Sequence, residues 1–210
     1  MRFFFAALIA ACATPSEAGA PAESAMATIP KPGPGQAVAV FAGGCFWCME
    51  TDFDHLDGVV ATTSGYAGGH TKNPTYMDVT GEDTGHQEAV RVVFDTEKLS
   101  YAAVVDYYFH HIDPTDGGGQ FCDRGDSYRP VIFAESAEQA ATATAAKAAL
   151  EAKKALPGPI VVPVVEGATF YAAEVYHQDF HEKNPSRYLP YRLGCRRDAR
   201  VSEVWRAEAG

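Results

Sequence analysis

A cysteine with the setting of a reactive thiol lies in the segment GGCFWCME, residues 43–50. The apolar run at 38–42 predicts a buried strand before it, and the spacing of apolar residues over 49–56 predicts a helix after it. We therefore expect Cys45 at a helix N-terminus, where unpaired N–H groups and the helix dipole favour thiolate over thiol. This setting indicates a catalytic nucleophile.

The amino-acid composition and net charge limit the kinds of partner that the chain is expected to bind. The chain has 210 residues, enough for one compact core, and its 27 acidic against 17 basic residues give a formal net charge of -10. Neither nucleic acid nor an anionic membrane would attract such a chain electrostatically, so neither is expected as a main partner. The cysteines are odd in number and widely spaced, which makes thiol chemistry at least as plausible as structural bridging: Cys12, Cys45, Cys48, Cys122 and Cys195.

The N-terminal segment predicts export. The apolar run at 3–11 is too short to span a membrane, and the tetrapeptide IAAC that ends at Cys12 resembles the lipobox of bacterial lipoproteins. We expect residues 1–12 to be a signal peptide with lipobox, residues 13–36 a disordered linker, and residues 37–210 one domain. The alternative for the first segment is an ordinary signal peptide cleaved nearby.

A lipid on Cys12 would make this an exported, periplasm-facing lipoprotein of a bacterium, so cell fractionation is expected to recover it with the membranes. The variant Cys12→Ala is expected to move it to the soluble fraction. Wild-type protein recovered wholly in the soluble fraction, with no change in Cys12→Ala, would exclude the anchor.

The folded part predicts alternating strands and helices. Strands are expected at 38–42, 59–66, 87–95, 130–134 and 160–165, and helices at 46–56, 101–111, 137–155 and 172–183. The order of the first six elements is that of an α+β ferredoxin-like two-layer sandwich. After this core we expect a long loop-rich C-terminal extension. Loops as long as 70–85 and 113–128 inside a compact domain are usually functional.

Eight short motifs resemble those of the methionine sulfoxide reductase A family. They occur in the same order and are spread from residue 38 to about residue 188, nearly all of the folded chain. They are GCFW at 44–47, GYAGG at 65–69, NPTY at 73–76, TGHQEAV at 84–90, DPT at 113–115, YR at 128–129, HQD at 177–179 and KNP at 183–185. The resemblance implies a ferredoxin-like core and reduction of the S epimer of methionine sulfoxide, free or in oxidised proteins. We expect a monomer that needs no metal or other cofactor.

The resemblance also implies roles for individual residues. Cys45 would be the nucleophile, Phe46 and Trp47 would hold the S-methyl group of the substrate, and Glu88 would protonate the sulfoxide oxygen. Further polar groups around that oxygen would be Tyr76, Asp123 and Tyr128. On pattern alone Glu88 would instead be a solvated carboxylate on a strand, so its role as an acid requires a site that lifts its pKa from about 4.3 towards about 6 or 7.

Attack by Cys45 leaves a sulfenic acid, which a second thiol must convert into a disulfide. We favour Cys195, because its tail is expected to be flexible, over Cys48, for which a rigid first helical turn demands favourable geometry. Cys122 is the third candidate. Regeneration then requires an external dithiol, which is thioredoxin in the cytosol or a membrane-linked relay outside it.

Other readings of the same residues remain open. A general thiol–disulfide oxidoreductase also carries Cys-x-x-Cys at a strand-to-helix turn, although the bulky Phe46-Trp47 spacer is unusual for that class. A non-catalytic surface lipoprotein that binds a partner is the third class. A zinc site from Cys45, Cys48, Cys122 and a histidine lacks a completing motif, and the helical pair His177 and His181 lacks the glutamate of zinc peptidases, so no metal is expected.

Overall fold

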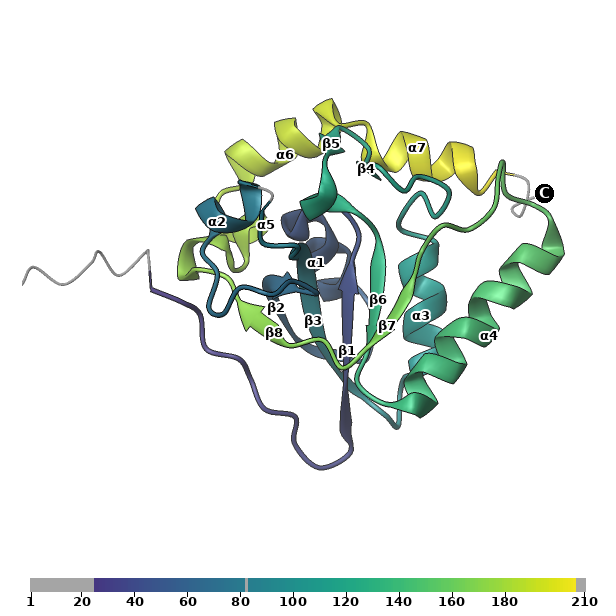
Figure 1. Ribbon diagram of the computed structural model, residues 1–210, viewed down its shortest axis with the longest axis horizontal. Coiled ribbons are helices and arrows are strands. Elements are labelled where there is room, and N and C mark those ends of the chain that lie inside the picture. The colour runs from purple at the N-terminus through teal and green to yellow at the C-terminus, as the bar shows by residue number, and fades with distance from the viewer. Residues whose placement is uncertain (1–24, 82, 207–210) are drawn as a thin grey trace, which may run out of the picture.

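The computed structural model describes residues 25–81 and 83–206. Its centre is a six-stranded mixed sheet in the order β7-β6-β1-β3-β2-β8, in which only the pair β6–β7 is parallel (Figure 1). The strands are β1 Gln36–Ala42, β2 Val59–Ala67, β3 Gln87–Asp95, β6 Val131–Ala134, β7 Val164–Glu166 and β8 Phe170–Ala172. A small second sheet pairs β4 Gly119–Gln120 with β5 Asp123–Arg124.

Helices cover the sheet and close one end of it. The helices are α1 Phe46–Asp54, α2 Tyr76–Thr80, α3 Tyr101–Phe109, α4 Ala137–Lys153, α5 Phe180–Lys183, α6 Pro185–Gly194 and α7 Arg197–Val204. Figure 1 shows α3 and α4 along one flank, while α6 and α7 run along the same end of the molecule as β4 and β5. The predicted α+β class is confirmed.

The central strands are apolar on both faces, because both faces are covered. One face, with Phe41 and Val92, packs against α1, α3 and α4 in the main core. The other, with Val40 and Val93, packs against Phe170 of β8 in a smaller cluster. This arrangement places the end of β1 and the start of β3 next to the start of α1, and these three segments position the residues of the site.

Part of the predicted N-terminal linker lies against the domain. Met26 forms an isolated antiparallel bridge with Glu174, and the Arg91 guanidinium donates to the Pro30 carbonyl at 2.8 Å. The predicted signal peptide and the lipidation of Cys12 lie outside the described residues and stay predictions. Within the described part, none of the helices has the length and apolar character that a membrane span requires.

The C-terminal prediction is wrong in two respects. The segment predicted as a helix at 172–183 instead contains the end of β8, the 3₁₀ helix Val175–His177 and the short helix α5. Its first residue belongs to β8, which pairs with β2. A continuous helix is also interrupted at Asp179, which has a left-handed φ of 53°. The predicted loop-rich extension is helical, since α6 begins on Pro185, a favourable first helical position, and α7 follows it closely.

Arg197 at the start of α7 ties this C-terminal pair of helices to the site. It is 2% exposed, and its guanidinium donates to the carbonyls of Gly43 at 3.1 Å and His111 at 2.9 Å. It also pairs with the buried carboxylate of Asp52 on α1 at 3.4 Å and lies over the ring of Phe121 at 4.6 Å. A buried cation with these partners holds the turn before α1 in place.

Candidate active site

Cys45 occupies the N-cap position of α1, directly after the turn that follows β1. The main-chain N–H groups of Cys48 and Met49 donate to its carbonyl at 3.1 and 3.2 Å, which starts the helix. Gly44 before it has a φ of 84°, and a Cβ there would lie 2.7 Å from Cβ of Gln120, so the turn requires glycine. The predicted handover from strand to helix at Cys45 is confirmed.

A cavity of about 80 Å³ lies beside Cys45. Its lining comes from α1, α2, β3, β5, the 3₁₀ helix Asp126–Tyr128 and α6, namely Cys45, Phe46, Trp47, Tyr76, Glu88, Asp123, Tyr128 and Tyr191. Seven of these eight are the residues to which the family resemblance gave catalytic or substrate-binding roles. The fold therefore brings all seven to one place, and it adds Tyr191.

Glu88 on β3 carries its carboxyl group inside this cavity and is 2% exposed. The main-chain N–H of Phe46 donates to its Oε2 at 2.9 Å. Burial raises the pKa of Glu88 to about 8, although the hydrogen bond from Phe46 lowers it, and the nearby Asp123 raises it further. Near neutral pH this carboxyl group keeps its proton, so it is an acid poised to donate into the cavity.

The thiol of Cys45 does not have the low pKa that its helix position alone predicted. Burial raises this pKa well above its usual range, and the neighbouring Cys48 and Glu88 raise it further, while a hydrogen bond with Tyr191 lowers it. The pKa of Cys48 is lowered, chiefly by a hydrogen bond from Cys45 and also by Arg197. Burial outweighs the helix dipole, so Cys45 rests as a thiol and must lose its proton during the reaction.

Phe46 and Trp47 build an apolar wall of the cavity. The indole of Trp47 stacks on Phe180 with ring centroids 3.7 Å apart, and its Nε1–H donates to Nδ1 of His177 at 3.1 Å. Burial lowers the pKa of His177 to about 4, so near neutral pH the imidazole is uncharged and its Nδ1 can accept that hydrogen. A wall fixed in this way suits a small apolar group such as a methyl.

Two tyrosine hydroxyls complete the polar side of the cavity. Tyr76 and Tyr128 are hydrogen-bonded to each other, and burial raises the pKa of Tyr76 to about 12 and that of Tyr128 further, so both remain donors. Tyr76 is held by a buried carboxylate: Glu174 Oε1 accepts from its main-chain N–H, and Oε2 accepts from the hydroxyl of Tyr66, each at 2.9 Å. Sequence reasoning considered Glu174 only as a partner of His177 or His181, and Nε2 of His177 does lie 3.9 Å from its Oε2. Its contacts with Tyr76 and Tyr66 were missed, because both residues are about a hundred positions away in the chain.

Asp123 and Tyr191 meet at the cavity from two different segments. The hydroxyl of Tyr191, on α6, donates to Oδ2 of Asp123 at 2.6 Å. The ring of Tyr191 meets the indole of Trp47 edge-on, with centroids 6.0 Å apart. Tyr191 was missed because its segment was predicted as loop; its position four residues before Cys195 was the only available signal.

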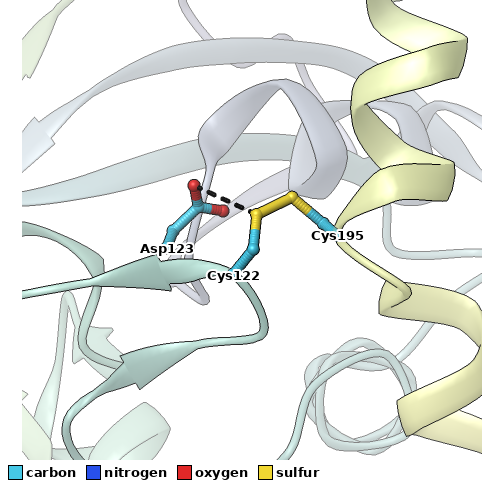
Figure 2. A group of neighbouring side chains, drawn as sticks. All are labelled: Cys122, Asp123 and Cys195. Atoms are coloured by element: carbon cyan, nitrogen blue, oxygen red, sulfur yellow. Dashed lines mark hydrogen bonds between the residues drawn. A yellow bond between two sulfur atoms is a disulfide. The ribbon is translucent and has the colours of Figure 1, made fainter.

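The cysteines divide into a free pair and a bonded pair. Cys45 and Cys48 are buried free thiols, whereas Cys122 and Cys195 form a disulfide with their Cα atoms 4.8 Å apart (Figure 2). The predicted flexible tail around Cys195 is wrong, since this residue caps α6 and its N–H donates to the carbonyl of Tyr191 at 2.9 Å.

The disulfide also bears on the zinc site considered from the sequence. Within the described residues, the metal-ligating atoms that gather closely belong to Cys122, Asp123 and Cys195. The two sulfurs of this group are bonded to each other (Figure 2), so they are not thiolate ligands in this state. Cys122 is therefore not available as a thiolate ligand for a zinc site with Cys45 and Cys48.

Comparison with known proteins gives consistent results. The family model described as peptide methionine sulfoxide reductase matches residues 37–209. Peptide methionine sulfoxide reductase MsrA 2 of Caulobacter vibrioides is 51% identical over 173 residues, which cover 82% of this chain and 87% of the relative.

Solved structures resemble the fold as well. Mxr1 of Saccharomyces cerevisiae in reduced form superposes with a TM-score of 0.69 at 30% identity, covering 75% of this chain and 91% of the yeast chain. Methionine sulfoxide reductase A of Corynebacterium diphtheriae gives a TM-score of 0.67 at 32% identity, with 75% and 79% of the two chains covered.

Proposed function

The chain belongs to the peptide methionine sulfoxide reductase A family and reduces methionine (S)-sulfoxide, and we propose that Cys45 is its nucleophile and Glu88 its acid. The observation that carries this assignment is the small cavity in which a buried, protonated carboxyl group accompanies a thiol at a helix N-terminus. Sulfoxide reduction needs both, because the oxygen is a poor leaving group until it is protonated.

The geometry gives each lining residue a place in the reaction. The substrate methyl group packs against Phe46 and Trp47, which puts the sulfoxide sulfur beside Cys45. The thiolate attacks that sulfur while Glu88 gives its proton to the oxygen, which the hydroxyls of Tyr76 and Tyr128 also bind. The substrate sulfur gains two electrons and leaves as a thioether, and the Cys45 sulfur loses two and takes up the hydroxyl group as a sulfenic acid.

The experiment that tests these roles is reduction of methionine (S)-sulfoxide with dithiothreitol by wild type, Cys45→Ser and Glu88→Gln. Loss of turnover in both variants supports the assignment. Reduction of insulin disulfides without sulfoxide turnover would support the other candidate class, a general thiol–disulfide oxidoreductase.

We propose Cys48 as the thiol that condenses with the Cys45 sulfenic acid, with Cys195 as the second candidate. The position of Cys48 supports this role, because its thiol is free, buried next to Cys45 and hydrogen-bonded to it. The lowered pKa of Cys48 also favours the thiolate form, which is the form that attacks. Cys195 is engaged with Cys122 in this state, so it would first have to be released.

After one turnover without added reductant, wild type is expected to carry a Cys45–Cys48 disulfide, mapped by mass spectrometry under non-reducing conditions. Cys48→Ser is expected to form about one methionine per protein and then stop, because its sulfenic acid has no neighbouring thiol. The matched variant Cys195→Ser is expected to form the Cys45–Cys48 bridge as wild type does. A Cys45–Cys195 bridge in wild type, and its loss in Cys195→Ser, would return the role to Cys195.

We propose that thioredoxin or another dithiol reduces the resulting disulfide. The chemistry requires such a donor, since each catalytic cycle leaves the protein oxidised by two electrons. Yeast Mxr1 has been solved in complex with Trx2. The exported location expected from the N-terminus would favour an envelope dithiol as the donor.

We assign the core to the ferredoxin-like class. The support is the antiparallel strand order β6-β1-β3-β2 together with helices α1 and α3, which is the arrangement of a split β-α-β unit. On this assignment β7, β8 and the C-terminal helices are additions to a four-stranded core.

A further inference from the structure

Residues 25–27, which precede β1, pair with the main chain on both sides of Glu174. The N–H of Ala27 donates to the carbonyl of Ala173 at 2.9 Å, and the N–H of Val175 donates to the carbonyl of Ala25 at 2.8 Å. Between these two bonds lies the antiparallel bridge of Met26 with Glu174. We call residues 25–27 the N-terminal strap.

The stretch that contains Glu174 is bonded to the sheet on its other side. The N–H of Ala173 donates to the carbonyl of Ser64 on β2 at 2.9 Å. The side-chain amide of Gln178 accepts from the N–H of Ser64 at 2.9 Å and donates to its carbonyl at 3.0 Å. Residues 173–175 therefore lie between β2 and the N-terminal strap, and without the strap their outer main-chain groups would form an unpaired edge.

The N-terminal strap lies outside residues 37–209, the part of the chain that the family model matches. The pairing along 173–175 is therefore supplied by the chain's own N-terminal segment and not by the matched domain. A second contact of this segment, from the Arg91 guanidinium to the Pro30 carbonyl at 2.8 Å, holds it against the sheet beyond the strap.

The side chain of Glu174 connects this stretch to the cavity. The residue is 6% exposed, and its two oxygens accept from the main-chain N–H of Tyr76 and from the hydroxyl of Tyr66, each at 2.9 Å. Nε2 of His177 lies 3.9 Å from Oε2, which is too far for a hydrogen bond. Glu174 is not among the residues that line the cavity, so it reaches the site through Tyr76.

Tyr76 depends on this acceptor because it is the first residue of α2, a helix of five residues. A helix cannot pair its first N–H groups internally, and the side chain of Thr75 accepts from Asp78 instead of from Tyr76. The bond to Glu174 is made by the main chain of Tyr76, so it fixes the start of α2. The start of α2 in turn sets where the Tyr76 hydroxyl lies in the cavity.

We propose that Glu174 is a positioning residue for sulfoxide reduction that acts through Tyr76, and that the N-terminal strap holds Glu174 in place. This inference rests on the proposed function, in which the hydroxyl of Tyr76 binds the sulfoxide oxygen. Glu174 exchanges no proton and makes no bond to the substrate. Its effect is on the geometry of the site, where a misplacement of about 1 Å can cost about 10²-fold in rate.

The first variant is Glu174→Gln in the full chain, measured as kcat/KM for methionine (S)-sulfoxide with dithiothreitol. Glutamine has the same shape but only one acceptor oxygen, so either Tyr76 or Tyr66 loses its partner. The value of kcat/KM is expected to fall about tenfold, the equivalent of one hydrogen bond. Circular dichroism checks that the fold is kept.

The second variant, Ala27→Pro, tests the N-terminal strap without altering a residue of the cavity. Proline removes the N–H that donates to Ala173, and kcat/KM is expected to fall about threefold. The matched control is Thr28→Pro, because the main-chain N–H of Thr28 has no hydrogen-bond partner among the described residues. This control is expected to stay within about 1.5-fold of wild type.

A double-mutant cycle with Tyr76→Phe separates positioning from a general loss of stability. Tyr76→Phe keeps the main chain of α2 and removes the hydroxyl through which Glu174 and the strap act. In this background Glu174→Gln and Ala27→Pro are each expected to lower kcat/KM by less than about 1.5-fold.

The inference would be overturned by equal losses in the two backgrounds, by wild-type kcat/KM in Glu174→Gln or Ala27→Pro, or by a loss in Thr28→Pro as large as that in Ala27→Pro. Full activity of Tyr76→Phe would instead refute the role of Tyr76 in the proposed function. Absence of turnover in wild type would refute the proposed function itself.

Discussion

Replacing Cys45 by serine is expected to lower kcat/KM for methionine (S)-sulfoxide by at least about 10⁴-fold, because the reaction then has no nucleophile. Serine is smaller and remains compatible with the N-cap position of α1, so the fold is expected to be kept. Turnover with dithiothreitol as reductant measures the loss, and circular dichroism checks the fold.

The matched control for Cys45→Ser is Cys48→Ser, which removes the neighbouring buried thiol on the same helix. This control is expected to form its first methionine at a rate close to that of wild type, since Cys48 acts only after the sulfenic acid exists. Substantial turnover by Cys45→Ser, or loss of the first methionine in Cys48→Ser alone, would move the nucleophile to Cys48.

The second large effect is expected for Glu88→Gln, which should lower kcat/KM about 10²- to 10³-fold near neutral pH. Glutamine has the same shape and can still accept the hydrogen bond from the main chain of Phe46, but it has no acidic proton to give to the oxygen. The measurement is steady-state kinetics with dithiothreitol.

The direction in which kcat/KM changes with pH tests whether Glu88 is the acid. Its pKa is raised to about 8, so the protonated, active form predominates below that pH and is lost above it. Wild-type kcat/KM is therefore expected to fall on the alkaline side of about pH 8, and Glu88→Gln is expected to lack this fall. Glu88→Asp is the control, because it keeps an acid at shorter reach and should retain the alkaline fall at a lower rate. The same alkaline fall in Glu88→Gln would show that another group supplies the proton.

Local sequence signals were sufficient to predict the backbone setting of Cys45. The glycines, Cys45 and the apolar spacing of 49–56 lie within a few residues of one another, and they correctly predicted a strand, a tight turn and a helix start. The pKa of Cys45 could not be predicted in the same way, because it depends on burial in the folded protein and on Glu88 and Tyr191, which reach the site from β3 and α6.

The features of the site that the sequence pattern alone does not predict depend on packing between segments far apart in the chain. The alternation along 87–95 would leave Glu88 on a polar face, but β3 lies between β1 and β2 and is buried along nearly its whole length. Glu174 and Tyr191 contact partners far away in the chain, so their spacing in the sequence could not predict these contacts. Helix α6 was missed, and for α7 only a helical turn or two at 201–206 was expected. The burial of Arg197 against α1 helps to define the position of this segment, and that contact is long-range.

The central claim is that the sulfur of Cys45 receives the oxidation that leaves the substrate. The most direct measurement is a single turnover of reduced Cys48→Ser with one equivalent of methionine (S)-sulfoxide and no reductant, followed by mass spectrometry of the intact protein and its peptides. The account predicts one methionine formed for each oxygen atom added to Cys45. Methionine formed with Cys45 left unmodified, or with the oxidation found on Cys122 or Cys195 alone, would contradict it.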